Sequence, residues 1–505
     1  YLNKVITLFF AFYDSGRKVR EKARFYLTLQ LFFIHFNRGK RIMQKEEANK
    51  VTVQKQGGTR IDMLNGGLFR KILIFALPLM GSGALQQSFN SVDVAVVGRF
   101  ASSQALAAVG SNGLIISLII NLFVGISVGV NVVIAHYIGQ KDTLRIKDAI
   151  HTAATVAIVS GLFLLVFGII IARPLLEALD TPPDVLDLAV LYLRLYSLGM
   201  PFMMIYNFGA AILRSMGDTK RPFYSLIVAG IVNTVLNLLL VIVFGMGVAG
   251  VAISTVISNV VNAAIIVYLL INESDPFKLE LKKISIIRPE LKKMLRIGLP
   301  AGMQGMVFSV SNVFILATVN SFGSDAMAGS AAALNFEYYC YFAIAAFGQA
   351  AVAFVSQNYG AGQTDRCDKI YRQSMLLSIL SCGILNILIF WQKEAFIGIF
   401  TSEPEVIHYA AIRISYVLLF QFIASSYEIS AATMRGLGYS MTPTILTIFG
   451  TCLLRLLWVY AVCPRYHDFK VLMSVYPLSW VITGIAVCTA YFIVRKKAYA
   501  INRKL

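Results

Sequence analysis

Charged residues are scarce in this chain of 505 residues. Asp, Glu, Lys and Arg together make up 14% of it, whereas 57% is hydrophobic and the mean hydropathy is +0.70. About a quarter of the residues in a typical soluble domain are charged. The composition therefore excludes an ordinary soluble domain and indicates a membrane protein.

Cysteine and histidine are also few. The six cysteines are dispersed, no two have Cys-x-x-Cys spacing, and the five histidines are equally scattered. Disulfide frameworks and zinc sites need such residues at regular spacings. The sequence indicates neither of them. It also lacks the converging His and acidic residues, or the Ser/His pair, of an intramembrane enzyme, so we expect no catalytic residues and no cofactor.

A phosphate-binding loop is missing as well. The chain contains no Gly-x-x-x-x-Gly-Lys-Ser/Thr motif, which argues against ATP-driven pumping within it. Ion-coupled exchange, facilitated passage and flipping remain as functions for a membrane protein of this composition.

Long apolar runs, by contrast, follow one another along the chain. A run of about 18 or more residues with few charges is a candidate transmembrane helix. Twelve such runs are present, at residues 72–98, 111–137, 150–172, 186–213, 222–244, 248–271, 296–320, 329–355, 372–392, 405–433, 443–463 and 471–494. We therefore predict an all-α polytopic membrane protein with twelve transmembrane helices.

The net charge of +19 follows from where the basic residues lie. They gather in alternate connections between the runs, at 141–147, 214–221, 278–293 and 366–372, and after the last run at 495–504. The other connections contain fewer basic residues, or they contain acidic residues. This is the positive-inside pattern, which predicts that both termini are cytoplasmic. The basic excess is thus topological, and we expect no nucleic-acid partner.

Residues 1–62 differ from the rest in composition. Short aromatic runs at 5–12 and 25–36 alternate with Arg and Lys, and both are too short to span a bilayer. Met43 begins a polar stretch that is typical of a cytoplasmic start. We expect 1–42 to be upstream sequence rather than part of the native protein. The alternative is an amphipathic segment on the membrane surface.

The chain repeats itself at an offset of about 221 residues. The matched pairs are Arg214 and Arg435, Gly217 and Gly438, Pro222 and Pro443, Gly139 and Gly360, and Leu77-Pro78 and Leu299-Pro300. A half-length duplication in a very apolar chain is typical of a secondary transporter whose substrate site lies between the halves. The repeated Arg, Gly and Pro suit a corner between two helices, which is an architectural role.

The duplication also predicts the domain organisation. We expect two six-helix lobes, at 63–271 and 294–497, joined by a cytoplasmic connector at 272–293 and followed by a tail at 498–505. An even number of spans in each half means that both halves enter the membrane from the same side. The lobes are then related by a pseudo-two-fold axis along the membrane normal.

Asp93 is the sharpest candidate for a functional residue. An ionisable side chain in hydrocarbon is costly, so its presence suggests a role. Gln86, Asn90 and Asp93 follow one another at i, i+4 and i+7 and therefore share one helical face. Such a polar stripe lines a cavity or faces another polar helix. The alternative is a carboxylate near the outer end of the span that reaches water.

The fifth and sixth spans offer possible partners for Asp93. Asn233 and Asn237 lie one helical turn apart, and Ser254 and Thr255 follow in the next span. One carboxylate with several neutral oxygens could hold Na⁺, and Asp93, Asn233 and Asn237 are the possible ligands. The same carboxylate could instead carry a proton. Hydrogen bonding between helices is the structural alternative for the two asparagines.

The second half has its own polar residues inside spans. These are Glu337, Gln349, Glu428 and Arg455, which we assign with Gln86 and Tyr206 to a substrate cavity. Arg455 could form a structural ion pair with Glu428 or Glu337, which would lower the cost of burying either charge. The acids could also meet a cationic substrate. Tyr206 is one of several aromatic and methionine residues in two of the spans. These side chains could form an adaptable cavity, or they could be ordinary packing residues.

Together these residues resemble the multidrug and toxic compound extrusion (MATE) family, over residues 66–497. The resemblance rests on Leu77-Pro78, Val92-Asp93 with Gly98, Gly139, the corner from Arg214 to Pro222, Asn233, Asn237, the run from Gln357 to Gly362, and Arg435-Gly-Leu-Gly438. The order and spacing of these short motifs make the match specific. The sequence is more similar to the DinF-like bacterial branch than to the NorM branch.

The resemblance implies an inner-membrane antiporter with two six-helix lobes in a V. Such a protein exports organic, often cationic or aromatic, compounds in exchange for H⁺ or Na⁺. The resemblance makes Asp93 the coupling residue and Asn233, Asn237 and Thr255 its polar partners. We expect small organic substrates and membrane lipids as partners of a monomer.

Two departures from the family pattern bear on the coupling ion. The frequent second acid of the fifth span is here Asn237, and the seventh span, 298–319, carries no acid. A single carboxylate leaves H⁺ and Na⁺ both open. A flippase of lipid-linked precursors is the second choice, because Arg455 is the lone clear cation for its cavity. The duplication and the deep acids disfavour a passive channel.

Overall fold

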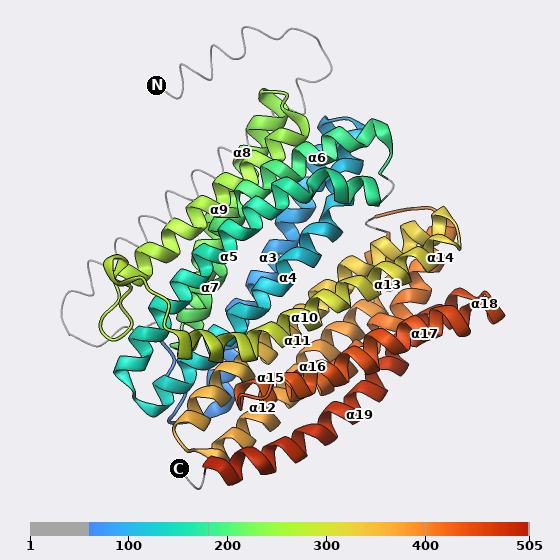
Figure 1. Ribbon diagram of the computed structural model, residues 1–505. Coiled ribbons are helices and arrows are strands. Elements are labelled where there is room, and N and C mark those ends of the chain that lie inside the picture. The colour runs from blue at the N-terminus through green and yellow to red at the C-terminus, as the bar shows by residue number, and fades with distance from the viewer. Residues whose placement is uncertain (1–59, 180, 399, 503–505) are drawn as a thin grey trace, which may run out of the picture. The chain divides into compact units, whose positions relative to one another are not determined.

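The computed structural model describes residues 60–502, except 180 and 399 (Figure 1). These residues belong to one compact unit and form helices, with no β-strand among them. The prediction that 1–42 is upstream sequence lies outside the described residues.

The first half of the described chain runs from α3 to α9. Its helices are α3 (Leu68–Phe100), α4 (Ser103–Gln140), α5 (Thr143–Ala178), α6 (Pro183–Leu198), α7 (Met200–Ser215), α8 (Lys220–Asn237), the π-helical η1 (Leu238–Val243) and α9 (Gly247–Ile271). The 3₁₀ turn η2 (Leu281–Lys283) lies in the connection to the second half.

The second half runs from α10 to α19. Its helices are α10 (Arg288–Asn320), α11 (Ser324–Gly360), α12 (Thr364–Trp391), α13 (Lys393–Ile397), α14 (Pro404–Arg413), the π-helical η3 (Ile414–Leu418), the 3₁₀ turn η4 (Gln421–Ile423), α15 (Ala424–Gly436), α16 (Met441–Thr447), the π-helical η5 (Ile448–Leu453), α17 (Leu454–Ala461), α18 (Cys463–Tyr466) and α19 (Phe469–Asn502).

The twelve predicted spans are confirmed in the described residues. Eleven helical stretches are long and apolar enough to cross a membrane, and a bent pair, α6 with α7, makes the twelfth. The prediction for 186–213 missed a bend of 46° between α6 and α7. Gly199 lies at the break and Pro201 in the first turn beyond it. Proline lacks the backbone N–H that would continue a helix, which explains a bend at this point.

The repeated corner forms in both halves as the sequence predicts. Gly217 follows α7 and Gly438 follows α15, and both have a φ of +88°, which favours glycine. Pro222 and Pro443 lie in the first turns of α8 and α16. The corners nevertheless differ in their surroundings. A Cβ at Gly217 would lie 2.3 Å from the carbonyl oxygen of Ile61, whereas no atom lies within 4 Å of such a position at Gly438.

The two halves meet most extensively where α4 crosses α10. Both helices carry a Gly-x-x-x-Gly motif, Gly125 to Gly129 in α4 and Gly298 to Gly302 in α10. A Cβ on Gly125 would lie 2.1 Å from the backbone nitrogen of Gly302, and one on Gly129 would lie 2.2 Å from the carbonyl oxygen of Met294. Small residues at this spacing let two membrane helices approach backbone to backbone. Packing of α11 against α3 and α4 extends the contact.

The segment that leads into α3 is held by both halves. Arg366 of α12 donates to the carbonyl oxygens of Gly66 and Asn65, at 2.9 Å each, and Asn358 of α11 donates to that of Met63 at 3.1 Å. On the other side, the backbone N–H of Ile61 donates to the carbonyl of Gly217 at 3.0 Å. This segment therefore connects the corner of the first half to the second half.

The segment that leads into α10 is held in the reciprocal way by α5 of the first half. His151 Nε2 accepts from the backbone N–H of Glu280, Thr152 Oγ1 accepts from that of Ile287, and Thr155 Oγ1 donates to the carbonyl of Ser285, at 3.1 to 3.2 Å. Each half thus binds the chain that enters the other half. Because the connection between the halves lies here, we call this end of the helices the connector end.

The glycine crossing yields a prediction about stability. Gly125→Ala places a methyl group against the backbone of Gly302, so the helices must separate, at a cost of about 1–3 kcal/mol for overpacking. We expect a lower midpoint of thermal unfolding in detergent. Gly113→Ala on the same helix is the matched control, because no atom lies within 4 Å of its Cβ position. Equal midpoints for the two variants would contradict the close crossing.

Candidate functional site

The predicted partners of Asp93 gather around it in the structure. Asp93 lies in the C-terminal part of α3, Asn233 and Asn237 form the last turn of α8, and Ser254 and Thr255 lie in α9. The Asn237 amide nitrogen donates to the Asp93 carboxylate, and it lies 3.3 Å from Asn233 Oδ1. The carboxylate therefore joins α3 to α8.

The hydroxyl groups of α9 complete this cluster. Ser254 Oγ donates to the Asn237 amide oxygen, and Asn233 Nδ2 donates to Thr255 Oγ1 at 3.4 Å. The Asn237 side chain is thus fixed at both ends, with its nitrogen toward Asp93 and its oxygen toward Ser254. We refer to Asp93, Asn233, Asn237, Ser254 and Thr255 as the Asp93 cluster.

The Asp93 cluster is buried and holds no compensating positive charge. The Asp93 side chain is 8% exposed, Asn237 is fully buried, and no described Lys, Arg or His forms an ion pair with Asp93. Tyr192 and Tyr196 of α6 also interact electrostatically with Asp93, and sequence analysis missed both. A buried carboxylate without a counter-charge is costly. A proton or a cation bound there would lower that cost.

A bound metal cation would need oxygen atoms, and the cluster supplies several. They belong to the Asp93 carboxylate, the Asn233 amide and the Thr255 hydroxyl. The Asn237 oxygen points to Ser254, so the amide must rotate before it can join them. The described residues contain no group of three or more His, Cys, Asp and Glu that could hold a metal ion.

Gln86 and Asn90 share the helical face of Asp93 but not its burial. Both side chains are exposed. The neighbouring face of α3 meets the second half instead, where Ser88 Oγ lies 3.3 Å from the Tyr339 hydroxyl of α11. The predicted polar stripe therefore continues from the buried cluster to exposed positions. A polar side chain exposed at membrane depth faces water more favourably than lipid.

Two other predicted cavity residues lie apart from the Asp93 cluster. Tyr206 is 9% exposed and packs in the core of the first half, where it interacts electrostatically with Arg214. Gln349 is half-buried in α11. The structure thus brings neither residue to Asp93.

The second half contains a buried ion pair that sequence analysis assigned to the wrong arginine. Glu337 of α11 accepts from Arg413 Nε at 2.6 Å and from its Nη2 at 3.0 Å, and both side chains are about 5% exposed. Arg455, the predicted partner, instead donates to Ser479 Oγ at 3.2 Å. Arg413 lies at the end of α14, 76 residues after Glu337. The two residues belong to different helices, so helical spacing in the sequence could not predict their contact.

Tyr476 of α19 connects the two arginines. Its ring centroid lies 5.6 Å from the Arg413 guanidinium and 4.4 Å from that of Arg455, so both cations are within cation–π range of one ring. Glu428 of α15 remains outside this group. It is half-buried and accepts a hydrogen bond from the Tyr341 hydroxyl at 3.4 Å. We refer to Glu337, Arg413, Arg455 and Tyr476 as the arginine cluster.

Every π-helical segment of the described chain borders one of these two clusters. η1 begins directly after Asn237, η3 begins directly after Arg413, and η5 ends two residues before Arg455. A π turn adds a residue to the helix, which rotates the side chains beyond it, and such turns are frequent at functional sites. No hydropathy pattern marks them, so the sequence did not indicate their positions.

The arginine cluster yields a second prediction. Glu337→Gln removes the charge that compensates Arg413, and breaking one side of a buried ion pair costs about 3–5 kcal/mol. We expect a lower thermal midpoint in detergent, with most of the loss recovered in the double variant Glu337→Gln with Arg413→Gln. Glu428→Gln serves as the control, because Glu428 has no ion-pair partner among the described residues. A Glu337→Gln variant as stable as this control would contradict a structural pair.

The sequence and fold agree with one known protein family. The model of the family MatE matches residues 78–239 and 300–461. The two matched segments begin at 78 and 300, that is, 222 residues apart, which agrees with the repeat found in the sequence. They contain most of α3 to α8 and of α10 to α17 respectively.

Two individual relatives also match this chain over most of its length. The chain is 29% identical over 392 residues to a Bacillus subtilis (strain 168) protein called "Probable multidrug resistance protein YoeA", which covers 76% of this chain and 84% of the relative. It is 27% identical over 406 residues to "Probable multidrug resistance protein NorM" of Thermotoga maritima, over 77% of this chain and 84% of that protein.

A solved structure supports the fold. It is described as "Outward-facing conformation of a multidrug resistance MATE family transporter of the MOP superfamily". The match covers 90% of this chain and 100% of the chain in that structure, with a TM-score of 0.79 and a sequence identity of 21%. At this identity the likeness concerns the fold alone. The assignment to the DinF-like branch stays a prediction. On the family match, the chain belongs to the MATE family of multidrug efflux transporters and is a multi-pass membrane protein.

Proposed function

We propose that this protein is a cation-coupled antiporter that exports organic, cationic or aromatic, compounds by alternating access. The Asp93 cluster carries the proposal. Its carboxylate is buried among amide and hydroxyl groups, without a positive side chain to neutralise it. A site of this kind gains stability when it binds a cation, which makes the cluster sensitive to an ion gradient.

Ion binding at Asp93 would change the hydrogen bonds that join α3, α8 and α9. With the carboxylate ionised, the Asn237 N–H donates to it, and Ser254 holds the other end of the amide. Neutralising Asp93 weakens that charge-assisted bond. The contact between α3 and the pair α8–α9 then loosens, and η1, directly after Asn237, offers a place for the helix to adjust.

Alternating access requires the halves to separate at one end and close at the other. Contacts between them are dense at the connector end, where the two entering segments are bound reciprocally and the glycines of α4 and α10 meet. They extend as far as the Asn121–Ser309 hydrogen bond of 2.9 Å. We propose that these contacts close the cytoplasmic side and that transport releases them.

The proposed orientation follows from the basic connections. With the connector end and both termini in the cytoplasm of a bacterial cell, the protein lies in the inner membrane with its positive loops inside. Small organic compounds and membrane lipids are its partners, and it acts as a monomer. No cofactor takes part; the coupling ion, H⁺ or Na⁺, is a transported substrate.

A lipid-linked precursor flippase gains little support from the second half. Such a function needs free cations along the cavity for a phosphate-bearing substrate. The structure adds Arg413 to Arg455, but Arg413 is neutralised by Glu337. Arg455 lies buried over Tyr476 with a hydrogen bond to Ser479. Export of organic compounds therefore remains the function that we propose.

The two coupling ions make different demands on the cluster, which an experiment can separate. A proton needs the Asp93 carboxylate alone, whereas Na⁺ needs several oxygens and a rotated Asn237 amide. Efflux of cationic dyes is measured from proteoliposomes under a pH gradient and, separately, a Na⁺ gradient. Asn237→Leu should abolish Na⁺-driven efflux, while proton-driven efflux persists at a reduced rate. If the Asn237→Leu variant kept both the Na⁺-driven and the proton-driven efflux in full, this result would contradict a role for Asn237.

Replacing Asp93 tests the proposal itself. Asp93→Asn removes the charge that the coupling ion neutralises, so we expect at least about a tenfold loss of gradient-driven efflux, with normal insertion in the membrane. Asp184→Asn is the matched control, because Asp184 is an exposed carboxylate in the first turn of α6. Normal coupled efflux by Asp93→Asn under both gradients would refute the assignment.

A further inference from the structure

The part of α10 next to the connector end has two chemically different faces. One face is buried against α4, where Glu290 accepts a hydrogen bond of 2.5 Å from the Tyr137 hydroxyl and lies 3.3 Å from Lys293 Nζ. Met294 and Gly298 continue this face toward the glycine crossing. The opposite face is largely exposed: Arg288, Lys292, Arg296 and Leu299 are exposed, whereas Leu295 is half-buried against the core.

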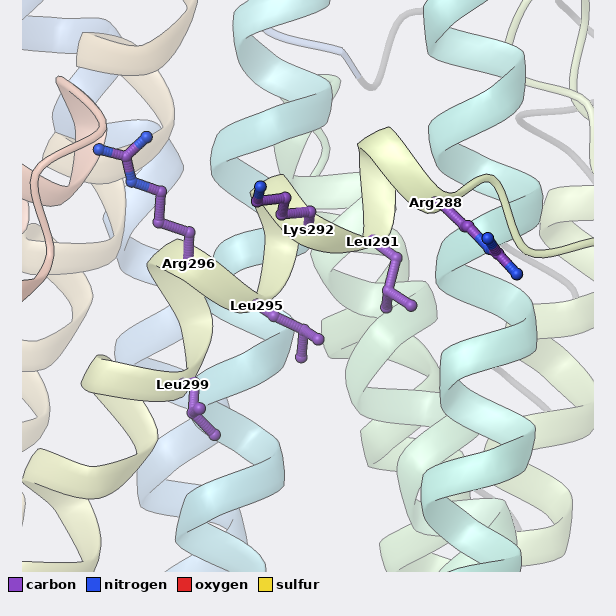
Figure 2. A pocket seen from close by; sticks show the side chains of 6 residues that line it. All are labelled: Arg288, Leu291, Lys292, Leu295, Arg296 and Leu299. Carbon is purple, nitrogen blue, oxygen red and sulfur yellow. The ribbon is translucent and has the colours of Figure 1, made fainter.

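That opposite face forms a shallow hollow of about 450 Å³. Six residues of α10 line it: Arg288, Leu291, Lys292, Leu295, Arg296 and Leu299. Figure 2 shows the three leucines projecting from one side of the helix, with Lys292 and Arg296 pointing the other way in this view. We call this surface the basic groove.

The basic groove consists of two parallel stripes. Arg288, Lys292 and Arg296 recur every four residues, and each is followed three residues later by a leucine. At 1.5 Å per residue the basic stripe is about 12 Å long. It begins at the first residue of α10, and the leucine stripe reaches further into the helix, to Leu299. Cations therefore lie toward the connector end and apolar surface toward the middle of the span.

The three cations are unneutralised, unlike the basic residues beside them. Arg288, Lys292 and Arg296 are exposed, and none forms an ion pair with a described residue. Lys293 pairs with Glu290, and Lys283 pairs with Glu280 at 2.8 Å. The groove thus presents three positive charges that no described residue compensates with an ion pair.

The internal repeat supplies a comparison for the groove. At an offset of 222 residues, the leucines of α10 correspond to Phe69, Leu73 and Leu77 of α3, which are also apolar. The basic stripe does not recur in the same way. Lys292 corresponds to Arg70, but the positions of Arg288 and Arg296 hold a glycine and an isoleucine, at 66 and 74. The repeat copies the apolar stripe and leaves out two of the three charges.

We propose that the basic groove is a binding site for one anionic phospholipid of the membrane. Its phosphate lies against the cations of the basic stripe, and an acyl chain lies along Leu295 and Leu299. Basic pockets on membrane helices near the bilayer surface bind anionic headgroups in this way. A free phosphate ion would use the cations but not the leucines, and a zwitterionic lipid would leave the positive charge uncompensated. The charge and the apolar stripe together therefore favour an anionic lipid.

The proposal is tested by the lipid that the whole protein retains. The protein is reconstituted in bilayers of equal parts phosphatidylglycerol and phosphatidylcholine, extracted in mild detergent, and weighed by native mass spectrometry. We expect a retained phosphatidylglycerol on the wild type. The triple variant Arg288→Gln, Lys292→Gln, Arg296→Gln should retain at least about tenfold less, since each basic residue near a membrane surface contributes roughly a fivefold gain.

A matched control removes the same number of exposed charges elsewhere. Arg70→Gln, Lys496→Gln and Lys497→Gln together include the repeat's equivalent of Lys292 and should retain the lipid as the wild type does. If both triple variants retained phosphatidylglycerol equally, or lost it equally, the result would overturn the site. Lipid retention would then not depend on where the positive charges lie. Circular dichroism and thermal midpoints confirm that the variants are folded.

The apolar half of the site has its own test. Leu295→Ala with Leu299→Ala should lower phosphatidylglycerol retention while the basic stripe is intact. Addition of millimolar inorganic phosphate to the extracted wild type should leave the lipid bound. Displacement of the lipid by inorganic phosphate, or full retention by the leucine variant, would overturn the lipid site in favour of a simple anion site.

Discussion

The close approach of α4 and α10 is the contact on which the arrangement of the two halves depends. Four glycines let the backbones touch, and any side chain there would push the halves apart. The reciprocal binding of the two entering segments lies at the same end of these helices. One steric constraint thus determines where the halves are closed, and the polar clusters lie in the bundles on either side of this crossing.

The two halves share a fold but solve the problem of buried charge differently. In the first half, buried Asp93 accepts a hydrogen bond from the Asn237 amide, which stabilises the carboxylate without neutralising it. In the second half, Glu337 is neutralised by a bidentate arginine. A neutralised pair stabilises one structure, whereas an uncompensated acid responds to ions. This difference explains why the proposed coupling site lies in the first half.

Much of the Asp93 cluster was predictable from the sequence, while most of the arginine cluster was not. Asp93, Asn233 and Asn237 are polar residues in very apolar runs, so each was conspicuous by itself. Arg413 lies in a run of mixed composition and was missed, although an arginine inside a predicted span is the signal that would have identified it. The pairing of Arg455 was wrong because nothing in a sequence tells which of two buried arginines an acid will face.

The sequence by itself determined the number of spans and the duplication, because hydropathy over about 20 residues depends on composition alone. The tertiary structure decided which polar groups meet. Asp93 and Asn237 are 144 residues apart, and Glu337 and Arg413 are 76 apart. At such separations the contact depends on helix packing and on the π turns. These features arise from backbone geometry that no local pattern of residues encodes.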